Sequence, residues 1–266
     1  MPIFTDQLNR KVNLNGIPQR IVSLVPSQTE LLFDLGLRKE VIGITKFCIH
    51  PHEWFHTKTR IGGTKKYDFE KIKNLNPDLI IGNKEENEQA QIELLMKEHS
   101  VWMSDIYTLK DALEMIMRVG VMVGKSREAT LLKLTIESEF KKCVINKTRP
   151  PLKASYLIWK NPYMVAGKNT FINEMLEYCG FNNVFNKEEF SRYPEVSIEQ
   201  MKEAKPDVIF LSSEPYPFKD IHIAEFKAIF KDTLVLLVDG ELFSWYGSRL
   251  LQAPAYFFNL GNQINI

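Results

Sequence analysis

The chain has 266 residues, of which 44% are hydrophobic, 25% are charged and 11% are aromatic. This length and composition indicate a globular protein with one large domain or two small ones, which excludes a disordered chain and a coiled coil. The 34 Lys and Arg residues against 33 Asp and Glu give a formal net charge of +1. No global field therefore attracts nucleic acid or an anionic membrane, and a partner has to be recognised locally.

The cysteine count and the apolar stretches bear on the compartment. Three cysteines, Cys48, Cys143 and Cys179, are an odd number at irregular spacing, which is not the pattern of a disulfide framework. No apolar stretch approaches the roughly 20 residues that a membrane-spanning helix needs. Residues Met1–Asn15 lack the basic start and apolar core of a secretory signal. We expect a cytoplasmic location for the chain as written, and a periplasmic or cell-envelope location if an export segment has been removed.

Residues 20–108 alternate between strand-like and helical patterns. Short β-type runs are separated by segments with apolar residues at helical spacing. The expected strands are Arg20–Val25, Val41–Ile44, Asp78–Gly82 and Val101–Met103, and the expected helices are Leu31–Gly36, Asp68–Leu75 and Glu86–Glu98. This alternation predicts a parallel sheet covered by helices on both faces.

The middle of the chain is helical, and the last part returns to the α/β pattern. Apolar residues recur at helical spacing from about Leu109 to Lys147, with a break near Gly124. Pro150 and Pro151 end the helix because they supply no backbone donors. The expected strands that follow are Ala154–Trp159, Asp207–Ser212 and Leu234–Asp239, and the expected helices are Thr170–Cys179, Ile198–Ala204 and His222–Phe230.

An internal repeat links the two α/β regions. Residues Phe69–Ile81 lie over Ile198–Phe210 at one constant offset, and each copy reads as a short amphipathic helix, a Pro-Asp turn and a buried strand. Pro-Asp turns are common in α/β proteins, so a chance match is the alternative. We expect two similar lobes joined by a helix, with boundaries at 1–108, 109–149 and 150–266. A ligand would then be buried in the cleft between the lobes.

One loop of the first lobe is rich in metal-binding residue types. Residues Phe47–His56 contain three of the five histidines and one of the three cysteines. Imidazole and thiolate are ligands for zinc and similar metals. The spacing Cys-x-His-x-His matches no strong zinc motif, so a partly exposed loop without a metal is the alternative. Phe47, Cys48 and His50 are the expected ligand contacts, with Cys48 and His50 as the candidate metal ligands.

Further candidate ligand residues follow the other expected strands. Glu85 would bind a cation or the polar rim of a ligand, although acids also favour the first turn of any helix. Trp159 and Tyr163 leave a strand as ligand platforms, with core packing as an equal alternative. Two prolines stiffen the loop that carries Glu214 and Tyr216, which keeps their side chains preorganised.

The last candidate loop, residues 239–249, combines aromatic surface with one cation. Its expected ligand contacts are Phe243, Trp245, Tyr246 and Arg249. Arg249 would bind a carboxylate or phosphate, or would instead pair with a neighbouring acid.

Motifs of the common enzyme classes are missing. The chain has no Walker-type phosphate loop, no dinucleotide fingerprint after its first strand, no G-x-S-x-G elbow and no H-E-x-x-H helix. We therefore expect a protein that is not an enzyme and has no catalytic residues. An α/β enzyme acting on a small substrate is the less favoured alternative, because the architecture hosts many reactions.

Several segments in a fixed order resemble the helical-backbone substrate-binding proteins of ABC importers, most closely the cobalamin and ferric-siderophore receptors. The segments that carry the resemblance are Arg20–Glu30, Ile61–Thr64, Phe69–Ile81, Gly167–Thr170, Leu176–Gly180 and Trp245–Arg249. The resemblance implies two Rossmann-like α/β lobes with parallel sheets, joined by a long backbone helix. It also implies a shallow cleft for a corrinoid, haem or metal chelate.

The resemblance also implies a membrane partner. In the cobalamin receptors an acidic residue on each lobe docks onto arginines of the permease. Glu70 falls at the first of these positions, and Ser244 falls at the second. Among the aromatic corrin contacts of the family, Phe47 keeps an aromatic residue, whereas three other positions do not. These are Thr64, Asn83 and Leu242.

The leading hypothesis is a substrate-binding protein that captures a cobalamin-like corrinoid or a ferric-siderophore or other metal chelate between its lobes. The alternative of another class is a receptor for a free metal ion such as zinc. The expected partners are a small-molecule ligand and an ABC permease, without nucleic acid, and the chain is expected to be a monomer. Cobalamin or a metal chelate enters as the ligand, and no further cofactor is expected.

Overall fold

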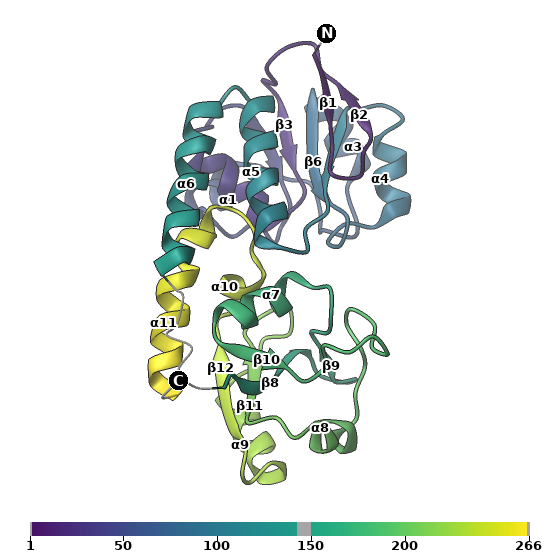
Figure 1. Ribbon diagram of the computed structural model, residues 1–266. Coiled ribbons are helices and arrows are strands. Elements are labelled where there is room, and N and C mark those ends of the chain that lie inside the picture. Colours follow the sequence, from purple (N-terminus) through teal and green to yellow (C-terminus); the bar gives the residue numbers. More distant parts are fainter. Residues whose placement is uncertain (1, 143–149, 265–266) are drawn as a thin grey trace. The chain divides into compact units, whose positions relative to one another are not determined.

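The computed structural model describes residues 2–142 and 150–264 (Figure 1). The chain divides into two compact units. Unit 1 comprises Met1–Ile106, Lys110–Thr135 and Tyr246–Arg249, and unit 2 comprises Tyr107–Leu109, Ile136–Trp245 and Leu250–Ile266. The lobe boundaries expected from the sequence, 1–108, 109–149 and 150–266, stay a prediction.

The described residues of unit 1 form a five-stranded parallel sheet in the order β5-β4-β3-β6-β7. Its strands are β3 (Ile21–Ser23), β4 (Val41–Ile44), β5 (Thr59–Arg60), β6 (Leu79–Asn83) and β7 (Val101–Ser104). Strands β3, β6 and β7 are buried along their whole length, because helices cover both faces. Helices α1 and α5 lie on one side of this sheet, and α3 and α4 lie on the other (Figure 1).

The helices of unit 1 follow the strands in alternation. They are α1 (Pro26–Asp34), α2 (His52–Thr57), α3 (Phe69–Leu75), α4 (Gln89–Leu95), α5 (Leu109–Met122) and the first part of α6 (Ser126–Lys142). A two-stranded antiparallel hairpin, β1 (Ile3–Thr5) with β2 (Lys11–Asn13), precedes the sheet. Neither this hairpin nor helix α2 is expected from the sequence, which predicts a loop over residues 52–56.

The helical middle of the chain consists of two helices, and the expected break near Gly124 is confirmed. Helix α5 ends at Met122, and α6 begins at Ser126. Gly124 between them has φ of +71°, a conformation that glycine adopts without the penalty of a side chain. The division between the two units falls inside α6, after Thr135. The rest of the expected helix, including Cys143 and the residues up to Arg149, lies outside the described residues.

The described residues of unit 2 form a second parallel sheet, in the order β10-β8-β11-β12, with β9 antiparallel to β8. Its strands are β8 (Leu152–Trp159), β9 (Met164–Val165), β10 (Phe181–Asn183), β11 (Val208–Ser212) and β12 (Leu234–Val238). The helical segments are α7 (Phe171–Tyr178), α8 (Ile198–Ala204), α9 (Asp220–Ile229), α10 (Gly240–Ser244), the 3-10 turn η1 (Ser248–Leu251) and α11 (Ala253–Ile264). The α/β class with a parallel sheet in each of two lobes is therefore confirmed.

The sequence repeat corresponds to equivalent elements of the two units. Helix α3 precedes β6 in unit 1, and α8 precedes β11 in unit 2. Asp68 caps α3 by accepting a hydrogen bond from the N–H of Lys71, and Ser197 caps α8 in the same way. Both helices end in a left-handed residue, Asn76 and Lys205 respectively. Each repeat is thus one helix–turn–strand unit with the same start and stop.

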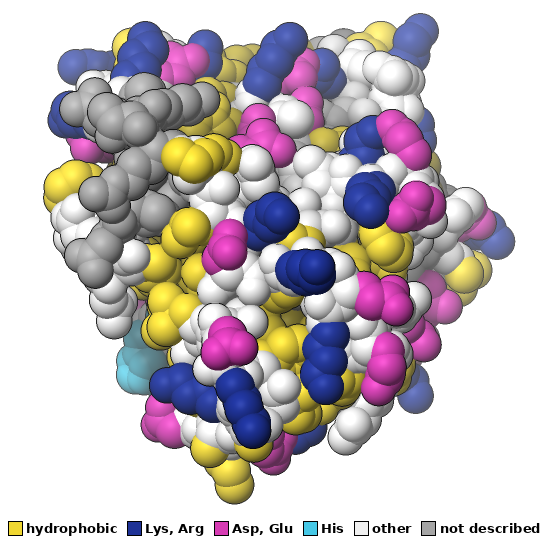
Figure 2. Space-filling view, turned by 60° about the horizontal axis from the view of Figure 1, so that its bottom comes forward, with side chains coloured by type: hydrophobic (Ala, Val, Ile, Leu, Met, Phe, Trp, Pro, Cys, Tyr) yellow, Lys and Arg dark blue, Asp and Glu magenta, His cyan; other side chains and the backbone are white. Residues whose placement is uncertain are grey.

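None of the helices formed by residues 2–142 and 150–264 has both the length and the apolar character to cross a membrane. On the face shown in Figure 2, Lys and Arg side chains are interspersed with Asp and Glu side chains. This mixture agrees with the near-neutral composition of the chain.

Candidate functional site

The loops that leave the strands of unit 1 gather at one edge of its sheet, because parallel strands all end on the same side. A buried polar network supports two of these loops. Gln28 of α1 donates from Nε2 to Ser104 Oγ over 2.7 Å and to the Gly82 carbonyl over 3.2 Å. Asn83 Nδ2 also donates to Ser104 Oγ, over 2.9 Å. These bonds tie the ends of β6 and β7 to α1 and make the edge rigid.

Phe47 supplies an exposed aromatic surface at this edge. Its side chain is 50% exposed although it follows the buried strand β4. Gly63, in the loop after β5, lies directly beside the ring, since a Cβ built there would be 3.3 Å from Phe47 Cε2. Lys46 Nζ lies 5.0 Å from the ring centroid. We call Phe47 with Lys46 and Gly63 the aromatic platform of unit 1.

Cys48 does not lie on this surface. Its side chain has no exposed area, and its Sγ is 3.1 Å from the hydroxyl oxygens of both Thr29 and Thr45. Burial raises the pKa of the Cys48 thiol, which favours its neutral form. The expected contact of Cys48 with a ligand or metal is therefore corrected to a structural role beneath the loop.

The described residues around this loop form no larger cluster of metal-binding side chains. His50 is half-buried. It follows Cys48, whose thiol is enclosed, by two residues in the sequence. Within residues 2–142 and 150–264, no group of three or more His, Cys, Asp or Glu side chains is arranged to hold a metal ion. A ligand contact through His50 stays a prediction.

Glu85 lies on an exposed turn after β6. The backbone N–H groups of Glu85 and Glu86 donate to Asn83 Oδ1 over 2.9 and 3.1 Å, which shapes the turn. The neighbouring Lys84 pairs with Asp105 over 2.7 Å. The carboxylate of Glu85 is exposed at the strand-end edge, and its contact with a ligand stays a prediction.

In unit 2 the exposed aromatic surface is formed by Trp159 and Tyr216. Trp159 ends strand β8 and is 39% exposed. Its ring packs edge-to-face against Tyr216, with the centroids 5.7 Å apart. Tyr216 is held in turn by Phe218, at 4.7 Å between ring centroids, and by His222, at 5.6 Å. We call Trp159 with Tyr216 the aromatic platform of unit 2.

Tyr163 has a more internal position than expected. It packs edge-to-face on Phe226 at 5.4 Å and against the apolar core of unit 2. Its half-buried ring therefore supports the loop that follows Trp159. Core packing of this kind is the alternative to a ligand contact for Tyr163.

Glu214 lies close to Tyr216 as an enclosed acid. Its Oε1 accepts hydrogen bonds from Ser244 Oγ over 2.7 Å and from Trp245 Nε1 over 2.8 Å. Burial raises the pKa of the Glu214 carboxyl, and these two hydrogen bonds oppose that rise. The side chain therefore fixes α10 to the loop after β11, and its contact with a ligand stays a prediction.

Phe243 belongs to the core of unit 2. Its ring has no exposed area and packs on Tyr156 at 5.1 Å and on Phe257 at 4.8 Å. The expected ligand contact through Phe243 is corrected for this reason. Trp245 and Tyr246 are each only 6% exposed, so protein covers most of both aromatic side chains.

Arg249 is paired with an acid, as the alternative interpretation held. Its guanidinium donates two hydrogen bonds to the Glu30 carboxylate, over 2.6 and 2.9 Å. The neighbouring Ser248 hydroxyl donates to the carboxylate of Asp34. Both acids belong to α1, so the segment Tyr246–Arg249 is fixed to unit 1 by charge-assisted bonds.

The structural repeat places a second exposed acid in a position equivalent to that of Glu70. Glu70 is exposed in the first turn of α3, and Glu199 is exposed at the same position of α8. Ser244 is not equivalent to Glu70, because it lies in α10 and its hydroxyl donates to Glu214 and to the Gly240 carbonyl. The constant offset of the sequence repeat aligns Glu199 with Glu70.

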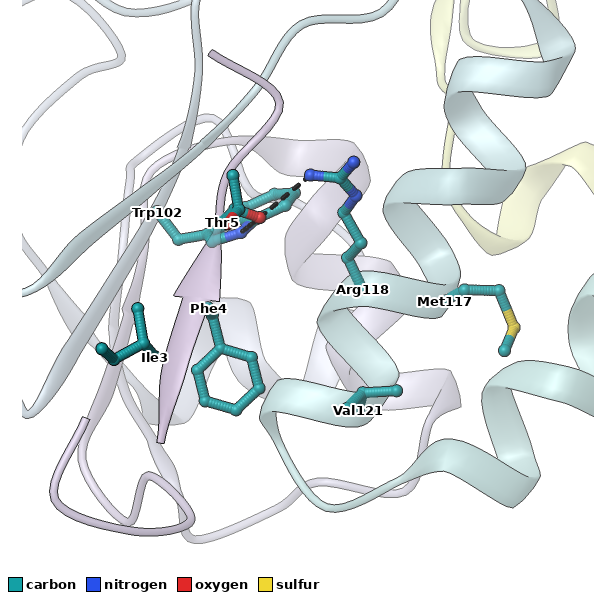
Figure 3. Close-up of a pocket in the computed structure, with 7 residues that line it drawn as sticks. All are labelled: Ile3, Phe4, Thr5, Trp102, Met117, Arg118 and Val121. Carbon is teal, nitrogen blue, oxygen red and sulfur yellow. Dashed lines mark hydrogen bonds between the residues drawn. The ribbon is translucent and has the colours of Figure 1, made fainter. Parts of the chain in front are cut away.

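Unit 1 also contains an apolar pocket away from these strand-end loops, with a volume of about 380 Å³ (Figure 3). Its lining residues are Ile3, Phe4, Thr5, Trp102, Met117, Arg118 and Val121. Arg118 Nη1 and Trp102 Nε1 both donate to the Thr5 carbonyl, over 3.0 and 3.4 Å, so these polar groups hold β1 in place. None of the predicted ligand residues lines this pocket.

The comparisons with known proteins identify the family. The family model described as "Periplasmic binding protein" matches residues 21–234, and the chain therefore belongs to that family. A vitamin B12-binding protein of Vibrio campbellii is 29% identical over 204 residues, which are 74% of this chain and 72% of that protein. The resemblance to the binding proteins of ABC importers is confirmed.

Solved structures share the fold. The periplasmic vitamin B12 binding protein of Vibrio cholerae has a TM-score of 0.79 at 21% identity, covering 94% of this chain and 99% of that chain. A periplasmic heme binding protein of Pseudomonas aeruginosa also has a TM-score of 0.79, at 20% identity, covering 90% and 91%. The chain is thus a substrate-binding protein of the ABC-importer type, from a fold that serves more than one ligand.

Proposed function

We propose that this protein binds a cobalamin-like corrinoid and delivers it to an ABC permease. The observation that carries the proposal is Phe47, an aromatic ring held half-exposed at the strand-end edge of unit 1. Trp159 supplies a second exposed ring at the strand-end edge of unit 2. Several relatives of the chain are named vitamin B12-binding proteins, which supports this choice of ligand.

The chemistry of the platforms suits a flat macrocycle. A corrin ring presents broad apolar faces, and burying such a face against an aromatic side chain is favourable. Each aromatic contact contributes about 0.5–1.5 kcal/mol beyond the area buried. The ring of Trp159 is braced by Tyr216, so that little of its side-chain freedom is lost on binding.

The charges near the strand-end loops favour a ligand of low net charge. Three cations of these loops are already paired with acids, and Lys46 lies beside the Phe47 ring as a single positive charge. The pairs are Lys84 with Asp105, Lys160 with Glu225 and Arg249 with Glu30. A ferric siderophore with several negative charges is best held by cations that have no such partners. The neutral amide groups on the rim of a corrinoid make no such demand, and for this reason we place the corrinoid ahead of the siderophore.

Titration of the purified protein tests the ligand. Cyanocobalamin and dicyanocobinamide would be followed by visible absorbance and by tryptophan fluorescence, with haemin and a ferric hydroxamate siderophore as competing ligand classes. We expect saturable binding of a corrinoid that is at least tenfold tighter than binding of the siderophore. Absence of saturable corrinoid binding, or a preference for the siderophore, would exclude the proposal.

Matched variants test the platforms. Phe47→Ala and Trp159→Ala are each expected to weaken corrinoid binding about tenfold, since each removes one stacking surface. Phe258→Ala is the control, because Phe258 is 57% exposed but lies in α11 rather than at a strand end. Equal losses in all three variants would mean that the platforms do not hold the ligand.

We also propose that Glu70 and Glu199 are the acids that dock onto the permease. Both are exposed in the first turn of equivalent helices, where a carboxylate reaches an arginine on a partner without a change of backbone.

A further inference from the structure

Helix α2 brings two imidazole rings together on the surface of unit 1. His52 and His56 are four residues apart and therefore lie on the same side of the helix. Both side chains are exposed, and their Nε2 atoms are 3.0 Å apart. The ring centroids are 4.4 Å apart with an interplanar angle of 63°. The two nitrogens are thus within hydrogen-bond distance of each other, and a metal ion that binds both would take the place of the shared proton.

The distance between the nitrogens suits a chelated metal ion. Two metal–nitrogen bonds of about 2.0–2.1 Å that span 3.0 Å enclose an angle of about 90–97° at the metal. That angle is the one between neighbouring ligands in square-planar and octahedral coordination, the geometries of Cu²⁺ and Ni²⁺. A tetrahedral ion would need the nitrogens about 3.3–3.4 Å apart at the same bond length.

The backbone under the two rings is anchored. Trp54, on the opposite side of α2, is 1% exposed and packs edge-to-face on Phe33 at 5.3 Å. At the end of the helix, the Arg60 guanidinium donates to the Phe55 carbonyl over 2.9 and 3.2 Å. The Thr57 hydroxyl donates to the Glu53 carbonyl over 2.8 Å. The backbone that carries the two imidazoles is therefore fixed before a metal binds, which lowers the entropy lost on binding.

We propose that His52 and His56 form a bidentate surface site for a divalent transition-metal ion, Cu²⁺ or Ni²⁺, with water completing the coordination. The site differs from the Cys48–His50 site expected from the sequence, because it uses neither of those residues. It also does not depend on the corrinoid ligand, since neither histidine belongs to an aromatic platform.

Titration with Cu²⁺ as the probe tests the site, with calorimetry for the affinity and electron paramagnetic resonance for nitrogen coordination. We expect one Cu²⁺ per chain to bind with two nitrogen ligands. His52→Ala and His56→Ala should each weaken this binding at least tenfold, because each leaves a single imidazole. His99→Ala, which removes a histidine after α4, should change the affinity less than twofold.

A variant with the same number of histidines separates chelation from binding to any exposed imidazole. The double substitution His56→Thr with Thr57→His moves the second ring from four to five residues after His52, out of reach of a shared metal. We expect the same tenfold loss as for His56→Ala. Both positions are exposed, so the circular dichroism spectrum and cyanocobalamin binding should stay unchanged. The proposal is overturned if the double variant binds Cu²⁺ as tightly as the unaltered chain, or if the unaltered chain shows no two-nitrogen signal.

Discussion

Asp78 and Arg20 exchange two hydrogen bonds that tie together the starts of the neighbouring strands β6 and β3. The backbone N–H of Asp78 donates to the Arg20 carbonyl over 2.9 Å, and the Arg20 N–H donates to Asp78 Oδ1 over 3.0 Å. Asp207 and Lys153 make the same pair of bonds in unit 2, over 2.8 and 2.7 Å. The Pro-Asp of the sequence repeat is therefore a register lock between adjacent parallel strands.

Removing this lock should destabilise one unit at a time. Asp78→Ala and Asp207→Ala each delete the acceptor of backbone N–H groups at a strand start, at an expected cost of about 1–2 kcal/mol in the free energy of unfolding. Urea unfolding followed by fluorescence measures the loss. The control is Asp232→Ala, an exposed acid outside the repeat, for which less than about 0.5 kcal/mol is expected. A loss no larger than that of the control would contradict the role of the lock.

The repeat explains how much of the fold was predictable. Each copy of the repeat has a seven-residue helix, a Pro-Asp turn that ends it and a buried strand, and these leave a local pattern in the sequence. Helix Ile198–Ala204 accordingly has the bounds expected from the sequence. Helix α2 has six residues, no side-chain cap and one buried residue, so it leaves almost no periodic pattern. The hairpin β1–β2 was missed because its short strands are mostly exposed and leave little hydrophobic pattern, whereas β3, equally short, is fully buried.

The candidate site was less predictable because burial depends on distant residues. Phe47 and Phe243 both follow strands and look alike in the sequence, yet one is 50% exposed and the other is not exposed at all. Phe243 is covered by Tyr156 and Phe257, neither of which is near it in the expected loop. The partner of Arg249 is 219 positions away. Local patterns name such residues as candidates but do not reveal what covers or neutralises them.

Breaking the Arg249–Glu30 pair should destabilise unit 1. The two side chains are only 11% and 14% exposed, so Arg249→Met leaves a carboxylate that is largely shielded from water and unpaired. We expect a loss of about 2–4 kcal/mol, below the upper range for fully buried pairs. Adding Glu30→Gln to this variant should recover part of the loss, since the unpaired charge is removed.

An exposed ion pair provides the control for Arg249. Lys142 and Glu139 pair over 2.6 Å with 68% and 36% of their side chains exposed, and Lys142→Met should cost less than about 0.5 kcal/mol. Thermal or urea unfolding measures all three variants. A loss for Arg249→Met as small as that for Lys142→Met would show that the bidentate pair contributes no more than a surface contact.

Glu214 should make stability depend on pH in unit 2. Burial raises the pKa of its carboxyl, so the folded protein holds this proton more tightly than the unfolded chain does. The stability contributed by protonated Glu214 is therefore fully present below the unfolded pKa and is lost as the pH rises through the folded pKa. Glu214→Gln keeps an acceptor for Ser244 and Trp245 but cannot ionise.

The free energy of unfolding of the Glu214→Gln variant, relative to that of the unaltered chain, should consequently increase between pH 4 and pH 7. Urea unfolding at a series of pH values measures this difference. Glu189→Gln, at an exposed position, should show no such trend. A difference for Glu214→Gln that stays constant or decreases with pH would mean that its hydrogen bonds outweigh the effect of burial.

Charge reversal at the two equivalent helices tests the proposed docking onto a permease. Glu70→Arg and Glu199→Arg place a cation where the partner is expected to present arginines, so each should reduce the ligand-dependent stimulation of the importer's ATPase at least tenfold through like-charge repulsion. Both acids are exposed, and corrinoid affinity measured without the permease should stay within twofold. Glu98→Arg, an exposed acid after α4, controls for the change in net charge. If Glu70→Arg impairs stimulation and Glu199→Arg does not, the second docking acid lies elsewhere. If Glu98→Arg impairs it equally, overall charge rather than the repeated acid governs the encounter.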